Sequence, residues 1–203
     1  MNSYTLSLIY TAFCLSIAME SYGANKGTGQ KETIARIERL GGKIRVAQDA
    51  PGNPIIHLDL SNTKATDDVL KDVNQFTELR VLRLGKTKIT SNGLRHLRLP
   101  NLEILFLQDT SITDKGLLAI RKMPRLKFLF LNGTNISDNV FNDLLRLKRL
   151  RVLELSHTAI TDSAVHKLTK MRNLTFLAIN GTKLTKTAKA KLREAMPNTI
   201  IVE

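Results

Sequence analysis

The segment Leu126-Lys-Phe-Leu129-Phe-Leu131-Asn-Gly-Thr134-Asn-Ile136-Ser-Asp138 is one copy of a pattern that occurs six times in this chain of 203 residues. Each copy reads apolar-x-x-Leu-x-(Leu/Ile)-x-x-Thr-x-apolar and is followed by a helix-like half. A fixed period of 23 or 24 residues indicates a solenoid, because one repeat buries its apolar side only by stacking on its neighbours. The copies begin at Ile55, Leu79, Leu102, Leu126, Leu150 and Leu174.

Each repeat is predicted to contain a strand, a turn and a short helix. Leu105 and Leu107 alternate with Ile104 and Phe106, which is the spacing of a strand. A hydroxyl followed by an acid, as in Thr113-Asp114, is a typical helix start, and apolar residues follow at helical spacing. We therefore expect an α/β solenoid with a curved parallel sheet on its concave side and short helices on its convex side. The inward helix residues are Leu117, Ile120, Met123, Phe141, Leu144, Leu147, Val165, Leu168 and Met171.

The ninth position of the repeat is threonine without exception, which indicates a physical requirement. A hydroxyl at this point can bond backbone groups that lose their ladder partner as the chain leaves the strand. A preference for turn residues alone would allow Ser or Asn as well. The six residues are Thr63, Thr87, Thr110, Thr134, Thr158 and Thr182.

From about Ile55 to Asn198 the chain resembles the leucine-rich repeat family, whose strand-and-turn signature the quoted segment fits. Threonine stands where many members carry Asn or Cys, and this variant resembles the bacterial subclass of 24-residue repeats common in exported proteins of planctomycete-like bacteria. The resemblance implies a curved binding scaffold without catalytic residues. Analogy with the family also offers a substrate-recognition module of an F-box-type ubiquitin ligase, although no F-box precedes the repeats.

Both ends of a solenoid need a cover for their cores. Residues 31–54 are expected to form the N-terminal cap, with an amphipathic helix over 31–40 and an edge strand over 43–48. Residues 25–30 read as a polar linker. The six repeats occupy 55–203, and residues 199–202 can add a final capping strand.

Residues 1–24 read as a signal peptide. Tyr4 to Met19 are mostly apolar and uncharged, and small residues follow near Gly23. An uncleaved N-terminal membrane anchor is the alternative, although the apolar run is shorter than the roughly 20 residues that span a bilayer comfortably. Cys14 is the single cysteine and lies in this segment. Export without disulfides favours a bacterial periplasmic, cell-surface or secreted protein.

No pattern points to catalysis, a metal or a cofactor. The four histidines occupy different repeat positions, and there is neither a cysteine cluster nor a phosphate-binding glycine loop. His57 and Asp59 share a strand face, but no nucleophile or third partner accompanies them. We therefore expect a protein that is not an enzyme.

Two outward positions of each strand, the third and the fifth, predict a binding face on the concave side. They bring large apolar residues together on adjacent strands, and an exposed aromatic cluster of this kind is typical of protein-binding sites. The alternative is that the rows only stiffen the sheet. The candidate residues are Arg83, Ile104, Phe106, Phe128, Phe130, Val152, Glu154 and Phe176, with Arg83, Asp109 and Glu154 expected at the rim.

Positive charge is expected along another edge, where helices end and link to the next strand. The chain has a formal net charge of +13. Such an edge can bind anionic polysaccharide or lipid, whereas export and the lack of a known motif argue against nucleic acid. Cations are also favourable at helix C-termini without any ligand. The candidate basic edge consists of Arg121, Lys122, Arg125, Arg146, Arg149, Arg151 and Arg172.

Overall fold

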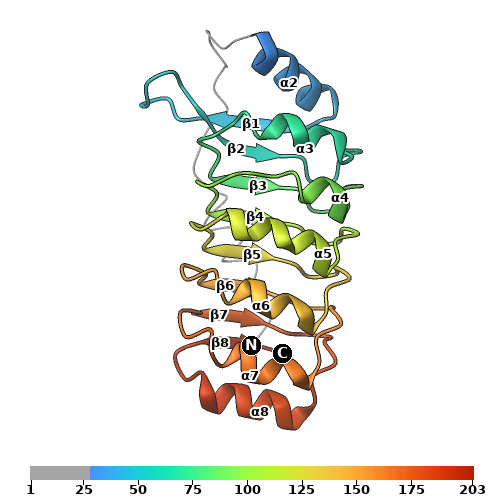
Figure 1. Cartoon of the computed structure of the whole chain (residues 1–203), viewed down its shortest axis with the longest axis vertical. Helices are drawn as coiled ribbons and strands as arrows, with labels where there is room; N and C mark the ends of the chain where they lie inside the picture. The colour runs from blue at the N-terminus through green and yellow to red at the C-terminus, as the bar shows by residue number, and fades with distance from the viewer. Residues whose placement is uncertain (1–27) are drawn as a thin grey trace.

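The computed structural model describes residues 28–203, which form one elongated stack of strands and helices (Figure 1). Eight strands make a single sheet in the order β1 to β8. The helices lie on one face of this sheet, so that the core is enclosed between the two layers. The predicted solenoid is confirmed.

The N-terminal cap consists of helix α2 (Thr28–Arg39) and strand β1 (Lys43–Val46). Strand β1 runs antiparallel to β2 (Ile55–Asp59), as expected of an added edge strand. Helix α2 begins three residues earlier than the sequence predicted, so residues 28–30 are helical rather than part of a linker. Contacts with the first repeat accompany this extra turn, since Gln30 donates to the Gln75 carbonyl and Gln75 donates to Thr33 Oγ1.

Six further strands complete the sheet, each parallel to its neighbour, and the last of them follows the sixth repeat at the position of the predicted capping strand. They are β3 (Val81–Arg83), β4 (Ile104–Phe106), β5 (Phe128–Phe130), β6 (Val152–Glu154), β7 (Phe176–Ala178) and β8 (Ile200–Val202). The helical halves are short and partly of the 3₁₀ type. They are α3 (Asp68–Val73), α4 (Ser91–Leu94), α5 (Asp114–Leu117), η1 (Leu118–Lys122), η2 (Asp138–Val140), α6 (Phe141–Leu144), η3 (Asp162–Ala164), α7 (Val165–Leu168) and α8 (Lys186–Ala195).

The strand register is the one that the alternation of the sequence predicts. Leu105 pairs with Leu129 and Leu129 with Leu153, and all three side chains are fully buried. The expected inward helix residues are buried as well, except Val165, which is only partly buried. The sheet and the helices therefore share one continuous apolar core.

The ninth-position threonines form hydrogen bonds with the backbone, as their presence in all six repeats predicts. In each repeat the hydroxyl donates to the carbonyl three residues earlier, as Thr110 does to Leu107 at 2.6 Å. Thr63 and Thr87 also accept from a backbone N–H two residues later. The same donor bond is made by Thr63, Thr87, Thr134, Thr158 and Thr182.

The residue before each of these threonines has a positive φ, so the turn requires the left-handed region. Glycine fits it best, and Gly133 has a second reason to be glycine: an added Cβ would lie 2.2 Å from Asp109 Oδ1. The other positions tolerate the conformation with larger side chains. The six residues are Asn62, Lys86, Asp109, Gly133, His157 and Gly181.

In four of the six repeats, a carboxylate near the start of the helical half connects to the next turn in the stack. Asp138 Oδ1 accepts from the backbone N–H of Thr161 at 2.9 Å, and its Oδ2 accepts from the Thr161 hydroxyl. We call this arrangement the inter-repeat clasp. It recurs from Asp67 to Thr90, from Asp114 to Ser137 and from Asp162 to Thr185.

Hydroxyls of the inter-repeat clasp are also the predicted helix caps, and not all of them make the capping hydrogen bond. Ser137 and Thr161 do cap their helices, since each accepts from a backbone N–H two residues later. Helix α5 begins at Asp114, as the Thr113-Asp114 pair predicts, but the Thr113 side chain makes no capping hydrogen bond. Its hydroxyl pairs with Ser91 Oγ at 3.0 Å, because Ser91 occupies the clasp position that holds Asp in the first, third, fourth and fifth repeats.

Within residues 28–203, no helix is long and apolar enough to cross a membrane. The predicted signal peptide or anchor at 1–24 lies outside the described residues, as do residues 25–27 of the predicted linker.

Candidate binding face

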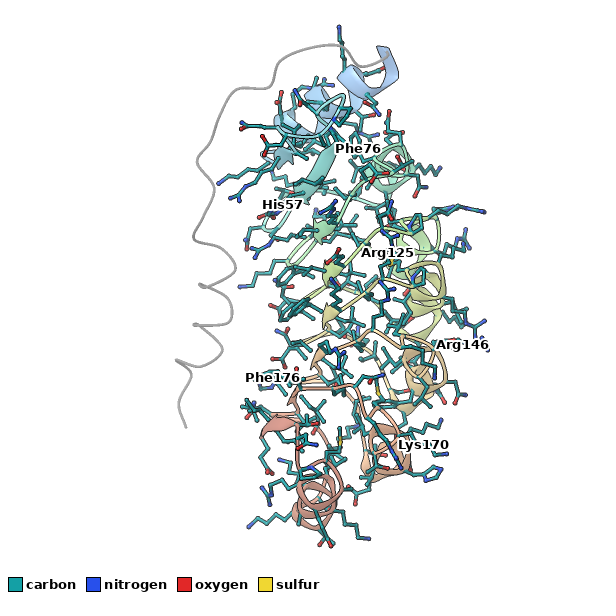
Figure 2. All side chains as sticks on the ribbon, turned by 90° about the vertical axis from the view of Figure 1, so that its left-hand side faces the viewer. His57, Phe76, Arg125, Arg146, Lys170 and Phe176 are labelled. Atoms are coloured by element: carbon teal, nitrogen blue, oxygen red, sulfur yellow. The ribbon has the colours of Figure 1, made fainter. Side chains whose placement is uncertain are left out.

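The third and fifth positions of the strands form two rows on the sheet face that points away from the helices. We call these rows the concave face. The third row runs from His57 through Ile104 to Phe176, and the fifth from Asp59 through Phe130 to Ala178. His57 and Phe176 lie on the same side of the molecule, opposite the helices (Figure 2). The predicted rows are therefore adjacent in space.

These rows contain an apolar cluster that is separate from the main core. Val81, Phe128 and Val202 pack against it and are partly buried. Because this cluster lies on the other side of the sheet, it does not join the sheet to the helices. Its buried members are Ile104, Phe106, Phe130, Val152, Phe176 and Ala178.

The expected exposure of this cluster is corrected by the structure. The exposed fractions of Ile104, Phe106, Phe130, Val152 and Phe176 lie between 4% and 8%. Stacking between neighbouring strands accounts for part of this burial, because the side chains of one row cover each other at the strand spacing of about 4.8 Å. Phe106, Phe128 and Phe130 also take part in further interactions.

Two stacked rings and one guanidinium form the aromatic centre of the concave face. The rings of Phe106 and Phe130 are parallel, with their centroids 4.2 Å apart. The Arg83 guanidinium carbon lies 4.3 Å from the Phe106 ring centroid, which is a cation–π contact. Arg83 on β3 therefore covers the β4 end of the ring stack.

Glu154 does not lie at a rim. Its side chain is buried within the apolar cluster, with an exposed fraction of 4%. Its Oε1 accepts from the backbone N–H of Ser156 at 2.8 Å. Asp109 belongs to a left-handed turn, is exposed, and stands outside the two rows.

His57 occupies a cationic environment at the N-terminal end of the concave face. Burial and then the charges of Arg45 and Arg83 lower the pKa of His57 to about 4, against a smaller opposing effect of Asp59. Its Nε2 is buried and has no hydrogen-bond partner within the described part of the chain. Asp59 instead accepts from the Ser61 N–H and lies 3.9 Å from Arg83. The two side chains are thus not arranged as an acid–base pair.

The residues of the predicted basic edge are all exposed. Arg125 and Arg146 lie toward the helices, away from His57 and Phe176 (Figure 2). Three members have partners: Arg121 pairs with Asp143, Arg151 donates to the Asn173 carbonyl at 3.2 Å, and Lys122 donates to the Arg95 carbonyl at 3.5 Å. Part of the positive charge of the basic edge therefore takes part in contacts within the protein.

Two grooves at the C-terminal end of the basic edge share Lys170 and Arg172. The larger has a volume of about 450 Å³ and is also lined by Thr169, Asn198 and Thr199. The smaller, of about 110 Å³, includes Lys148. Neither lining contains an acid. No sequence pattern predicts the grooves themselves, because they depend on how the last helices pack.

No group of three or more His, Cys, Asp or Glu side chains in residues 28–203 is arranged to hold a metal ion. The structure instead brings together apolar side chains, one stacked guanidinium and one buried carboxylate. Such a surface can bind another molecule by contact, and it offers no set of reacting groups.

Stacked units of strand, turn and short helix, with an inward leucine ladder, define a leucine-rich-repeat solenoid. A family model described as a leucine-rich repeat matches residues 98–120. No curated protein sequence matches the chain.

Solved structures of leucine-rich-repeat proteins are similar to this chain. A leucine-rich-repeat protein of Leptospira interrogans has a TM-score of 0.51 and 23% identity, over 66% of this chain and 33% of the other. Internalin C2 of Listeria monocytogenes has a TM-score of 0.49 and 16% identity, with coverages of 73% and 80%. The ectodomain of the Arabidopsis thaliana receptor kinase GASSHO1/SCHENGEN3 has a TM-score of 0.49 and 16% identity, with coverages of 78% and 22%. This chain spans about a third of the Leptospira protein, and the likeness concerns the fold.

Proposed function

We propose that this protein is a non-catalytic scaffold that binds another protein through its concave face and acts outside the cytoplasm. The observation that carries the proposal is the second apolar cluster, on the sheet face away from the helices. Burying the core does not require it, whereas aromatic anchors at the centre of a surface commonly dominate binding energy. A partner has to replace the present contacts of Phe106, Phe128 and Phe130.

A photo-crosslinking experiment tests the binding face. A crosslinking amino acid at position 128, where the side chain is only half-buried, should capture the same partner in repeated preparations from the native host. The same group at exposed position 149 on the basic edge serves as the control. Captures that depend on position 149 and not on position 128 would contradict the proposal.

A pair of variants separates binding from stiffening of the sheet. Phe106→Ser with Phe130→Ser should abolish binding of the captured partner, because single anchor truncations can cost about 2 kcal/mol or more. Reversing Arg146, Arg149 and Arg151 to Glu should change only the association rate and the salt response. If the serine variant binds normally, the rows serve the sheet alone.

A second candidate function is attachment to an anionic envelope polysaccharide or lipid through the basic edge. It is favoured by the two grooves that Lys170 and Arg172 line without an opposing acid. Sedimentation with vesicles of anionic lipid, at low and high salt, tests it with Lys170→Glu and Arg172→Glu. Binding that is unchanged in this variant would exclude the grooves as the site.

The export hypothesis has its own test. Mass spectrometry of protein from the native host should find a mature N-terminus near Asn25. An intact Met1 in a membrane fraction would favour the anchor instead.

A further inference from the structure

Glu154 is a buried charge in an apolar setting. In the fifth row its neighbours are Phe130 on β5 and Ala178 on β7. Among the third and fifth positions of β4 to β7, it is the one charged residue. A carboxylate among apolar side chains needs each oxygen either hydrogen-bonded or open at the surface, where another molecule can reach it.

Only one Glu154 oxygen has a partner within residues 28–203, namely the Ser156 N–H that binds Oε1. Asp59 provides an internal comparison, because it occupies the same position in the first repeat and accepts from the Ser61 N–H in the same way. Its second oxygen, however, lies 3.9 Å from Arg83 on the next strand. On the strand after Glu154 the corresponding residue is Ala178, which has no donor.

We propose that the partner itself supplies this cation, as a lysine or arginine side chain flanked by apolar residues. The inference rests on the proposed function of the concave face. The basic group would donate to Glu154 Oε2, while the apolar residues replace the present contacts of Phe130 and Phe106. These rings lie one and two strands away, about 5 and 10 Å along the stack, so the apolar residues stand within roughly two to four positions of the cation in the partner segment.

The net charge of the chain and the local charge of Glu154 act on a basic partner in opposite directions. The chain carries a net charge of +13, which repels cationic molecules at long range. A basic residue is therefore favoured at Glu154 only when its neighbours fit the apolar rows. Since the ion pair is enclosed, the affinity should change little between low and moderate salt.

Selection of random peptides from a display library on the full chain tests the inference. Wild type should enrich peptides that have a basic residue close to apolar ones. Glu154→Gln, which preserves the shape, should lose the basic preference and keep the apolar one. A selected peptide made synthetically should bind Glu154→Gln about tenfold or more weakly than wild type.

Two further comparisons make the result specific. Replacing the basic residue of that peptide by norleucine should weaken binding to wild type and leave binding to Glu154→Gln unchanged, which is the signature of direct coupling. Ala178→Arg places a cation where β3 has Arg83, and should lower the affinity for the basic peptide. Circular dichroism first verifies that this variant is folded.

The outcomes separate this inference from the proposed function. Apolar peptides without a basic residue, whose binding still requires Phe106 and Phe130, would overturn the role of Glu154 and leave the concave face as the site. Basic peptides that bind Glu154→Gln as well as wild type would overturn it too. Peptides that bind independently of the two phenylalanines would contradict the proposed function itself.

Discussion

Asp67 of the first repeat accepts two hydrogen bonds from Thr90 of the second, at 2.7 Å from the backbone N–H and at 2.6 Å from the hydroxyl. One carboxylate thus satisfies two donors of the next repeat. At the other end of the stack, the two hydrogen bonds from Thr185 lower the pKa of Asp162. In the sixth repeat, Lys186 stands at the position that an Asp occupies in four of the other repeats.

Removing one clasp should lower the free energy of unfolding. Asp67→Ala leaves the Thr90 N–H and hydroxyl without their acceptor, and the expected loss is about 1–3 kcal/mol. The neighbouring Asp68 is exposed and makes no clasp, so Asp68→Ala should stay within about 0.5–1 kcal/mol. Chemical denaturation of both variants provides the measurement. Equal losses would show that the clasp adds no stability.

The hydroxyl of the ninth-position threonine should contribute to stability beyond the volume that its side chain fills. Thr134→Val preserves the volume but removes the hydroxyl donor of the Leu131 carbonyl, which then keeps only the Thr134 N–H at 3.3 Å, and should cost about 0.5–1.5 kcal/mol. Thr77→Val at an exposed position is the matched control. Both are compared by thermal unfolding. Tolerance of valine at position 134 would contradict the hydrogen-bonding explanation of the invariant threonine.

The leucine ladder should dominate stability. Leu129 is fully buried, so Leu129→Ala should cost about 2–5 kcal/mol. Leu118 is 46% exposed, and Leu118→Ala should remain near the surface range of about 0.5 kcal/mol. Urea denaturation of both proteins checks the difference. A loss at position 129 within the surface range would reject the strand register.

The stability should fall as the pH is lowered from 6.5 to about 4, because His57 has a folded-state pKa of about 4 against 6.5 for an unperturbed histidine. Between these two pH values His57 is protonated in the unfolded chain but neutral in the folded chain. The effect is complete below the folded pKa. His57→Gln should flatten this part of the profile of unfolding free energy against pH. An unchanged slope would mean that burial does not hold His57 neutral.

Much of the fold follows from two periodicities in the sequence. The alternation of Leu105 and Leu107 with Ile104 and Phe106 fixes which side chains face the core, and the 24-residue period places equivalent positions side by side. The concave rows could therefore be predicted residue by residue. Their burial could not, since the exposure of a ring depends on what its neighbours cover.

The hydrogen bonds of Asp138 and the burial of Glu154 could not be predicted from the neighbouring sequence, because their contacts come from adjacent repeats. The Thr-Asp pair reads as a helix start, yet the bonds of Asp138 go to Thr161, 23 residues later. Glu154 was expected at a rim, because charged residues are usually exposed. Its actual position depends on Phe130 and Ala178 on the adjacent strands.

Ser91, at the second clasp, forms the weakest of the five clasps and so marks a junction between a shorter N-terminal part and a longer C-terminal part of the stack. Ser91 bonds Thr113 without a formal charge, whereas the other four clasps use a carboxylate, and hydrogen bonds to ionised groups are the stronger ones. Repeats that contact only their neighbours can open locally, at the weakest junction. Amide hydrogen exchange should therefore find α2 to α4 exchanging as one cooperative unit ahead of β4 to β8. The aromatic stack of Phe106 and Phe130 belongs to the slower unit, so it would stay assembled while the N-terminal part of the protein unfolds and refolds.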